Sequence, residues 1–166
     1  VLLVADEVIC GFGRTGEMFG STTFGMQPDI LTCAKALTSG YMPMSAVMVS
    51  AKVHDALAAN SGRIGTFGHG YTYSGHPVAA AVALETLKVY EEDDIVGQVR
   101  RAAPAFQRQL RALAQRRSVG EARGVGLIGA IELVSDKAGR TPFDPALKAG
   151  ATVARLAQER GLIVRA

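Results

Sequence analysis

The chain has 166 residues, of which 48% are hydrophobic and 20% are charged, and its formal net charge is +3. This composition is typical of a folded globular protein, and the longest apolar run, Val78 to Leu84, is too short to span a bilayer. The densest basic segment, Arg100 to Arg117, has helical spacing and indicates a solvated charged face. We therefore predict neither a nucleic-acid partner nor a membrane partner.

Cys10 and Cys33 are the only cysteines, and neither lies at a metal-ligand spacing. The three histidines have no paired carboxylate motif beside them, so we predict that no metal is bound. Two reduced thiols are typical of a cytoplasmic protein, which is the location we expect.

The first half of the chain has the pattern of short strands joined by glycine-rich loops. Ser50 is placed to cap a helix over residues 51–59, and residues 60–70 are rich in glycine and predict a loop. The predicted strands are Val1 to Ala5, of the buried parallel type, Asp29 to Ala34, and Ser45 to Val49.

The second half is dominated by helical patterns. Pro77 opens an alanine-rich helix to about Glu92 that is apolar on nearly all sides, which predicts burial. Further along, the predicted elements are an amphipathic helix over 95–117 with a kink or a new start at Pro104, a strand over 127–134, a helix over 145–160 that stops at Gly161, and a last strand over 162–165. Strands alternating with helices predict an α/β fold, with a domain boundary near residue 94.

Two charged residues follow buried strands, at the edge where α/β sheets bind ligands. Asp6 comes after five apolar residues, and Lys35 comes after the run Ile30 to Ala34. Either residue alone has an ordinary explanation, a capping aspartate or a solvent-seeking lysine. Together they suit pyridoxal phosphate, which needs a lysine for its aldehyde and an acid for its pyridine nitrogen.

A phosphate site is also present in the sequence. Residues 69–77, His-Gly-Tyr-Thr-Tyr-Ser-Gly-His-Pro, offer hydroxyls and flexible backbone just before a predicted helix N-terminus. Residues 11–16 fit G-x-G-x-x-G, the dinucleotide fingerprint, but they follow the strand only after Asp6 to Cys10 and no helical pattern comes next. We therefore interpret these glycines as a loop that passes close beneath a cofactor.

Three motifs carry a resemblance to a known family. Residues 6–16, Asp-Glu-Val-Ile-Cys-Gly-Phe-Gly-Arg-Thr-Gly, resemble the D-E-V-x-x-G-F-G-R-T-G signature of class III pyridoxal-phosphate-dependent aminotransferases, the omega-transaminase-like enzymes. Residues 34–43 and 70–77 resemble the lysine and phosphate-loop motifs of the same family, in the same order. The resemblance implies a part of the fold-type I large domain, a mostly parallel sheet with helices over residues 1–94, plus most of the α+β small domain over 95–166.

The resemblance also implies roles for individual residues. Lys35 would form the Schiff base, Asp6 would pair with the pyridine nitrogen, and Val8 would pack on the ring face. Tyr71 would contact the cofactor, and Thr72 would bind the phosphate of the neighbouring subunit's cofactor, in a homodimer with shared active sites or a tetramer. Arg165 would bind the substrate carboxylate.

The implied reaction transfers an amino group from an amine or omega-amino acid to a keto acid such as pyruvate. The alternatives are an aminomutase or decarboxylase of the same fold, and a non-catalytic fragment or interaction subunit. The chain opens inside a strand-like run and lacks the family's N-terminal half, so we expect a C-terminal fragment that is inactive when isolated.

Overall fold

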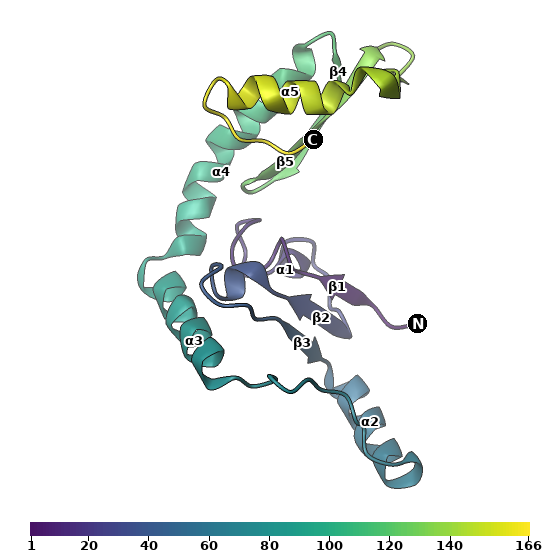
Figure 1. The fold of residues 1–166 in the computed structure, drawn as a ribbon, viewed down its shortest axis with the longest axis vertical. Helices are drawn as coiled ribbons and strands as arrows, with labels where there is room; N and C mark the ends of the chain where they lie inside the picture. Colours follow the sequence, from purple (N-terminus) through teal and green to yellow (C-terminus); the bar gives the residue numbers. More distant parts are fainter. The chain divides into compact units, whose positions relative to one another are not determined.

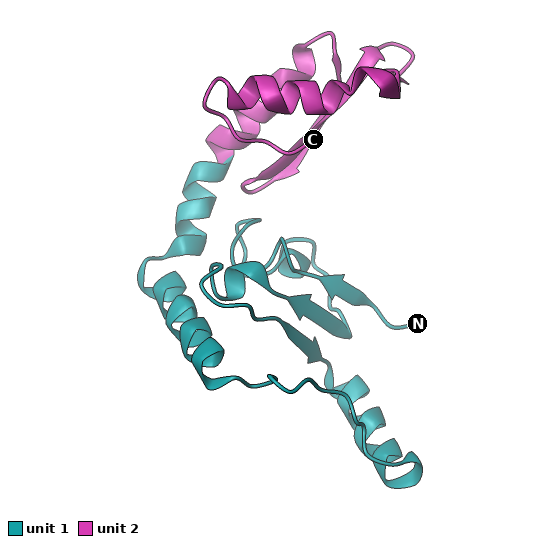
Figure 2. Ribbon diagram, viewed as in Figure 1, with its two compact units in different colours: residues 1–103 teal, residues 104–166 magenta.

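The chain folds into two compact units in a computed structural model that describes residues 1–166 (Figure 2). Unit 1 comprises Val1–Ala103 and unit 2 comprises Pro104–Ala166, so the division falls inside a helix. Unit 1 holds β1 (Val4–Asp6), α1 (Gly20–Thr23), β2 (Ile30–Cys33), the 3-10 turn η1 (Lys35–Leu37), β3 (Ala46–Val49), α2 (Ala51–Ile64), α3 (Pro77–Glu92) and the start of α4 (Ile95–Ala112). The domain boundary near residue 94 stays a prediction.

Unit 1 is built on a three-stranded sheet in the order β1-β2-β3 (Figure 1). β1 is parallel to β2, with Asp6 opposite Thr32, and β3 is antiparallel to β2. The three predicted strands are confirmed with shorter bounds, but the predicted burial of the first is wrong, because Val4 is 55% exposed. Its strand pairs with β2 along one edge only.

The entry into β1 is fixed by a side chain from the segment before β2. One carboxylate oxygen of Asp29 accepts the backbone N–H of Leu3 at 2.9 Å, and the other pairs with Lys52 at 3.3 Å. The N–H of Leu3 is the main cause that lowers the pKa of Asp29, and Lys52 adds to it. Both contacts favour the ionised carboxylate, which therefore holds the two parallel strands in register.

The helix α2 is longer than the sequence indicates. Ser50 occupies the N-cap position, but its hydroxyl makes no hydrogen bond, so the predicted side-chain cap is wrong. The helix continues to Ile64, into the predicted loop, and it accommodates Asn60 and Ser61, whose side chains donate to the carbonyls of Ala56 and Leu57 at 2.7 and 2.9 Å. It ends where Gly65 takes a φ of 100°.

α3 has the bounds that the sequence predicts, with Pro77 at its first position. The prediction of burial on all sides is wrong: only Ala79 and Ala83 are buried, and Leu84 is 69% exposed. One face of the helix packs on the core of unit 1, and its other faces have no covering element. That core consists of buried Phe12, Cys33, Leu37 and Ala83, surrounded by partly buried Met18, Phe19, Leu31, Ala36, Met44, Ala46, Leu87 and Tyr90.

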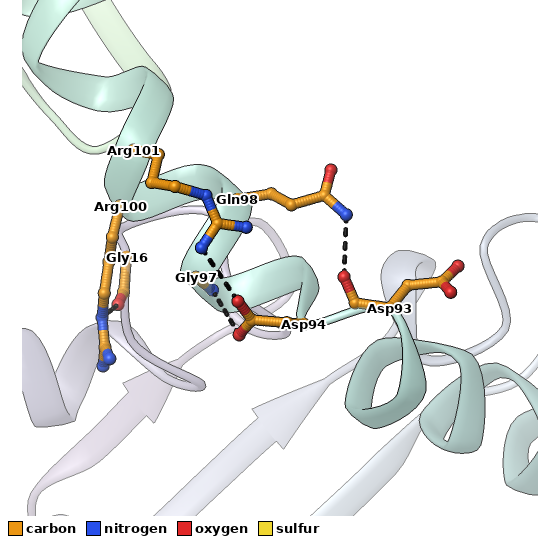
Figure 3. Close-up of polar contacts among 7 residues, drawn as sticks. All are labelled: Gly16, Asp93, Asp94, Gly97, Gln98, Arg100 and Arg101. Carbon is orange, nitrogen blue, oxygen red and sulfur yellow. Dashed lines mark hydrogen bonds and ion pairs between the residues drawn. The ribbon is translucent and has the colours of Figure 1, made fainter.

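The junction of α3 and α4 is held by Asp94 (Figure 3). Its carboxylate accepts the N–H of Gly97 at 3.2 Å, which satisfies a backbone donor in the first turn of α4. The same carboxylate pairs with the guanidinium of Arg101 at 3.0 Å, which balances its negative charge. A side chain at Gly97 would overlap that carboxylate, so it could be accommodated only if Asp94 moved away. α4 runs through Pro104 without a new start and ends at Ala112, followed by the 3-10 turn η2 (Leu113–Gln115).

Unit 2 contains an antiparallel hairpin of β4 (Val119–Val125) and β5 (Ile128–Asp136), extended by the short β6 (Thr141–Pro142). The sequence predicts β5 but not β4. The predicted helix over 145–160 is divided into the 3-10 turn η3 (Pro145–Leu147) and α5 (Ala149–Gln158), because Lys148 takes a left-handed φ of 45°. The predicted last strand is wrong, since residues 162–165 pair with no strand.

Gln107 connects α4 to this hairpin. Its side chain is 8% exposed, and its Nε2 donates to the carbonyls of Gly126 and Ile128 at 2.9 and 3.1 Å. Gly124 and Gly129 make room for the same helix, because a side chain at either position would overlap Leu110. The tip of the hairpin is therefore fixed to α4 by an amide donor and by close packing.

We predict that Gln107→Glu destabilises the full-length protein by roughly 2 kcal/mol or more, because it buries a carboxylate against two carbonyl oxygens. Urea denaturation followed by circular dichroism measures the loss. The deficit should shrink as the pH falls, since the introduced carboxyl binds a proton more tightly in the folded state and can then donate. Gln109→Glu, on an exposed position of the same helix, is the control and should change stability little. Equal stability of the two variants would contradict the assignment.

Candidate active site

Asp6 and Lys35 lie at the same edge of the sheet in unit 1. Asp6 is the last residue of β1, and Lys35 follows the end of β2 by two residues. Because β1 and β2 are parallel and Asp6 is opposite Thr32, the two chain segments leave the sheet in the same direction. The prediction that Asp6 stands at one strand end and Lys35 just beyond another is confirmed.

The carboxylate of Asp6 is held by one oxygen and open at the other. Its Oδ1 accepts the backbone N–H of Val8 at 3.0 Å, and the hydroxyl of Thr32 lies at 3.5 Å, the outer limit of a hydrogen bond. Its Oδ2 makes no hydrogen bond, and Asp6 forms no ion pair in the chain. Asp6 can therefore accept one further hydrogen bond from a ligand.

Lys35 begins the turn η1, and its side chain is exposed with no hydrogen bond or ion pair to the rest of the chain. Its backbone φ is 49°, in the left-handed region that non-glycine residues rarely adopt. Cys33, at the end of β2, is buried in the core at 3% exposure and anchors the start of this segment. The structure therefore presents a free amine on a constrained backbone.

Glu7 is a residue whose role the sequence reasoning missed. Its carboxylate is 3% exposed and accepts the backbone N–H groups of Gly20 and Ser21, at 2.8 and 2.6 Å. Side chains alternate in direction along a strand, so the neighbour of an outward Asp6 is expected to point the other way. That alternation was the available signal. Glu7 fixes the start of α1 to the end of β1.

The glycine-rich loop, residues 11–16, consists of turns and leads into no long helix. α1 has only four residues and starts at Gly20, which is not the strand-to-helix arrangement of a dinucleotide site. Phe12 packs against Phe19 and Tyr90, with ring centroids 5.7 and 6.2 Å apart. Arg100 of α4 donates to the carbonyl of Gly16 at 2.6 Å (Figure 3) and pairs with Glu17 at 2.7 Å.

The two thiols beside this site are protected from ionisation. Burial raises the pKa of Cys10, and the carboxylates of Glu7 and Asp6 raise it further. Burial also raises the pKa of Cys33. No group of three or more histidines, cysteines and carboxylates in the structure could hold a metal ion.

The other predicted site residues lie elsewhere in the chain. Tyr71 and Thr72 are exposed in the segment between α2 and α3, where Ser74 accepts the N–H of Tyr71 at 3.0 Å. The hydroxyl of Thr72 makes no hydrogen bond. Arg165 belongs to unit 2 and is exposed in a segment without regular structure, so it does not stand at a strand end as predicted. Among the predicted residues, the structure therefore places Asp6, Val8 and Lys35 after the paired ends of β1 and β2, at one edge of the sheet.

Comparison with known proteins identifies the family. The model of the class III aminotransferases matches residues 1–166, and the chain belongs to that family. It is 54% identical over its whole length to an uncharacterised aminotransferase of Sinorhizobium fredii, of which it covers 36%. It is 48% identical, over 99% of its length, to the chloroplastic gamma-aminobutyrate transaminase 3 of Solanum lycopersicum, of which it covers 32%.

The fold agrees with that assignment. A transaminase solved with L-alanine superposes with a TM-score of 0.94 at 52% identity, over 100% of this chain and 39% of the other. The chain thus has part of the fold of pyridoxal-phosphate-dependent transaminases, which confirms the predicted fold class. It spans about a third of the length of the curated relatives that it matches. No helix is long and apolar enough to cross a membrane.

The residues present fit the cofactor on which this family depends, pyridoxal 5'-phosphate. Asp6 has one carboxylate oxygen without a hydrogen bond, and the side chain of Lys35 has no hydrogen-bond or ion-pair partner. Both residues lie at the same edge of the sheet. A lysine bound in an ion pair, or an aspartate with both oxygens satisfied, would not suit a cofactor that needs both groups.

We predict that Glu7→Gln lowers the melting temperature of the full-length protein, measured by differential scanning calorimetry. Both carboxylate oxygens accept backbone N–H groups, so one of them would be replaced by an amide donor that faces another donor. The loss of such a charged hydrogen bond is worth roughly 1.5 to 3 kcal/mol. Glu91→Gln, at an exposed position of α3 without an ion pair, is the control. A Glu7→Gln protein that melts with the control would show that the contact contributes nothing.

Proposed function

We propose that the chain is the part of a class III transaminase that carries its Schiff-base lysine, and that the reaction moves an amino group from an amine or omega-amino acid to a keto acid such as pyruvate. The observation that supports the proposal most directly is the unpaired Lys35 beside the half-satisfied Asp6 at one sheet edge. The similarity to a gamma-aminobutyrate transaminase supports an omega-amino acid donor. The similarity to a transaminase solved with L-alanine supports pyruvate, its keto acid, as acceptor.

Lys35 has two roles in this proposal. Its Nζ would hold the cofactor aldehyde, and as a free amine it would take the proton from the substrate α-carbon and return it later in the reaction. When bound, the cofactor supplies an electron sink for the substrate's α-carbon. The absence of any competing ion pair leaves Nζ free for both roles.

Asp6 and Val8 act on the opposite end of the cofactor. The N–H of Val8 fixes Asp6 Oδ1, so Oδ2 remains available to accept a hydrogen bond from the pyridine nitrogen. With the cofactor bound, the Asp6 carboxylate would stabilise the protonated ring, because it would supply the negative counter-charge. The side chain of Val8, half-buried two residues beyond Asp6, would cover the ring face.

We further propose that Tyr71 and Thr72 bind the phosphate, and that Thr72 does so in the partner subunit of a homodimer. The free Thr72 hydroxyl and the position of this segment before the N-terminus of α3 support the assignment. Arg165 would bind the substrate carboxylate, since its exposed guanidinium forms no ion pair in the chain. A cytoplasmic location stays a prediction.

Replacing Lys35 with Ala in the full-length protein should abolish transamination together with the Schiff-base absorbance of the cofactor. Borohydride reduction followed by peptide mass spectrometry provides the measurement, because a reduced lysine–cofactor bond survives digestion. Lys52→Ala is the control, since Lys52 pairs with Asp29 on the surface and should leave the bond in place. A borohydride-reducible bond that persists in the Lys35→Ala protein would exclude Lys35 as the Schiff-base residue.

Shared active sites can be tested by mixing inactive subunits. If each site contains Lys35 from one subunit and Thr72 from the other, a dimer of one Lys35→Ala and one Thr72→Ala subunit has one site with both residues intact. Co-expression with two affinity tags isolates that heterodimer, which should regain activity up to about half of the wild-type level, in proportion to its one intact site. An isolated heterodimer that stays as inactive as its parents would place Thr72 outside the partner's site.

A further inference from the structure

The backbone that carries Lys35 is held in an unfavourable conformation. We call residues 34–42 the lysine turn. Lys35 and Ser39 have φ values of 49° and 50°, and Gly40 has a φ of 81°. A left-handed conformation at a non-glycine residue persists only when surrounding contacts enforce it. The contacts that enforce it here therefore determine where the lysine stands.

Hydrogen bonds inside the lysine turn are only part of that enforcement. The backbone bonds of η1 donate from Leu37 to Ala34, from Thr38 to Lys35 and from Ser39 to Ala36, and they are long at 3.1, 3.2 and 3.3 Å. The buried hydroxyl of Thr38 closes the later part, donating to the carbonyl of Met42 at 2.6 Å. The part nearest to Lys35 has no such side-chain bond from within the turn.

Tyr90 of α3 supplies that bond from outside. Its hydroxyl donates to the carbonyl of Ala36 at 2.6 Å and shares a second hydrogen bond with the hydroxyl of Ser39 at 2.9 Å. These two contacts stand on either side of Leu37, which is buried in the core. The ring of Tyr90 is itself stacked on Phe12 of the glycine-rich loop. The hydroxyl of Tyr90 thus bridges Ala36 and Ser39, just after Lys35, and connects the lysine turn to α3.

We propose that Tyr90 is a positioning residue for Lys35, and the inference rests on the proposed function of that lysine. The side chain of Lys35 forms no hydrogen bond or ion pair, so the backbone conformation alone fixes the point from which the side chain starts. Tyr90 fixes that backbone through Ala36 and Ser39. The residue does not touch the reacting atoms; it limits the directions from which Nζ can approach an aldehyde.

Tyr90→Phe is the test, because it removes the hydroxyl and keeps the ring against Phe12. In the full-length apoprotein, hydrogen exchange with mass spectrometry should show the amides of the lysine turn exchanging roughly tenfold faster, as expected for two lost hydroxyl hydrogen bonds. Thr86→Ala is the matched control, because Thr86 lies one turn earlier on α3 and its hydroxyl bonds only to its own helix, at the carbonyl of Val82. Exchange in the turn that is unchanged in Tyr90→Phe would overturn the proposal.

A second measurement separates positioning from plain stability. Pyridoxal 5'-phosphate is added to the apoprotein in a stopped-flow instrument, well below the melting temperature of both variants, and the rate constant for Schiff-base formation is recorded. Tyr90→Phe should slow it at least threefold, whereas Thr86→Ala should match the wild type. Faster exchange with an unchanged rate constant would reduce Tyr90 to a structural role. If Lys35→Ala still forms the Schiff base, the proposed function fails, and the exchange result still decides whether Tyr90 holds the turn.

Discussion

The parallel pairing of β1 with β2 is the constraint on which the site depends. It places Asp6 opposite Thr32, so the residues after each strand emerge at one edge of the sheet. Parallel strands cannot be joined by a tight turn, and residues 7–29 form the connection between them. That connection includes the glycine-rich loop, which explains how the loop comes to lie against the same core as the lysine turn.

The neighbouring carboxylates of Asp6 and Glu7 have different roles at this edge of the sheet. Asp6 is exposed, with one oxygen available to a ligand, while Glu7 is buried, with both oxygens used by backbone N–H groups. The alternation of side chains along a strand separates the two roles without any change of residue type. Tyr90 and Arg100 then connect the surrounding loops to α3 and α4, so the site is supported by helices that contribute no proposed ligand-binding residue.

The sequence predicts those parts of the structure that depend on local pattern. The Pro77 start of α3, the strand end at Asp6 and the strand end just before Lys35 are of this kind, because short apolar runs and helix signals are local. β4 was missed because its glycines, Glu121 and Arg123 hide the apolar alternation, and the last predicted strand fails because strand formation depends on a partner that pattern alone does not supply. The hydrogen-bond partners of Glu7 and Tyr90 could not be predicted for a similar reason, although strand alternation indicated that Glu7 points away from Asp6. These partners lie 13 to 54 residues away, and composition gives no information about such contacts.

The raised pKa values of Cys10 and Cys33 have a practical consequence. Peroxide and electrophilic reagents attack the thiolate, so a thiol that stays protonated at neutral pH reacts slowly. The negative charges that hold the site together, Glu7 and Asp6, are among the causes that keep Cys10 in this state. Both thiols should therefore form less thiolate than an exposed cysteine of ordinary pKa, so alkylating reagents should modify Cys10 and Cys33 more slowly than a surface cysteine.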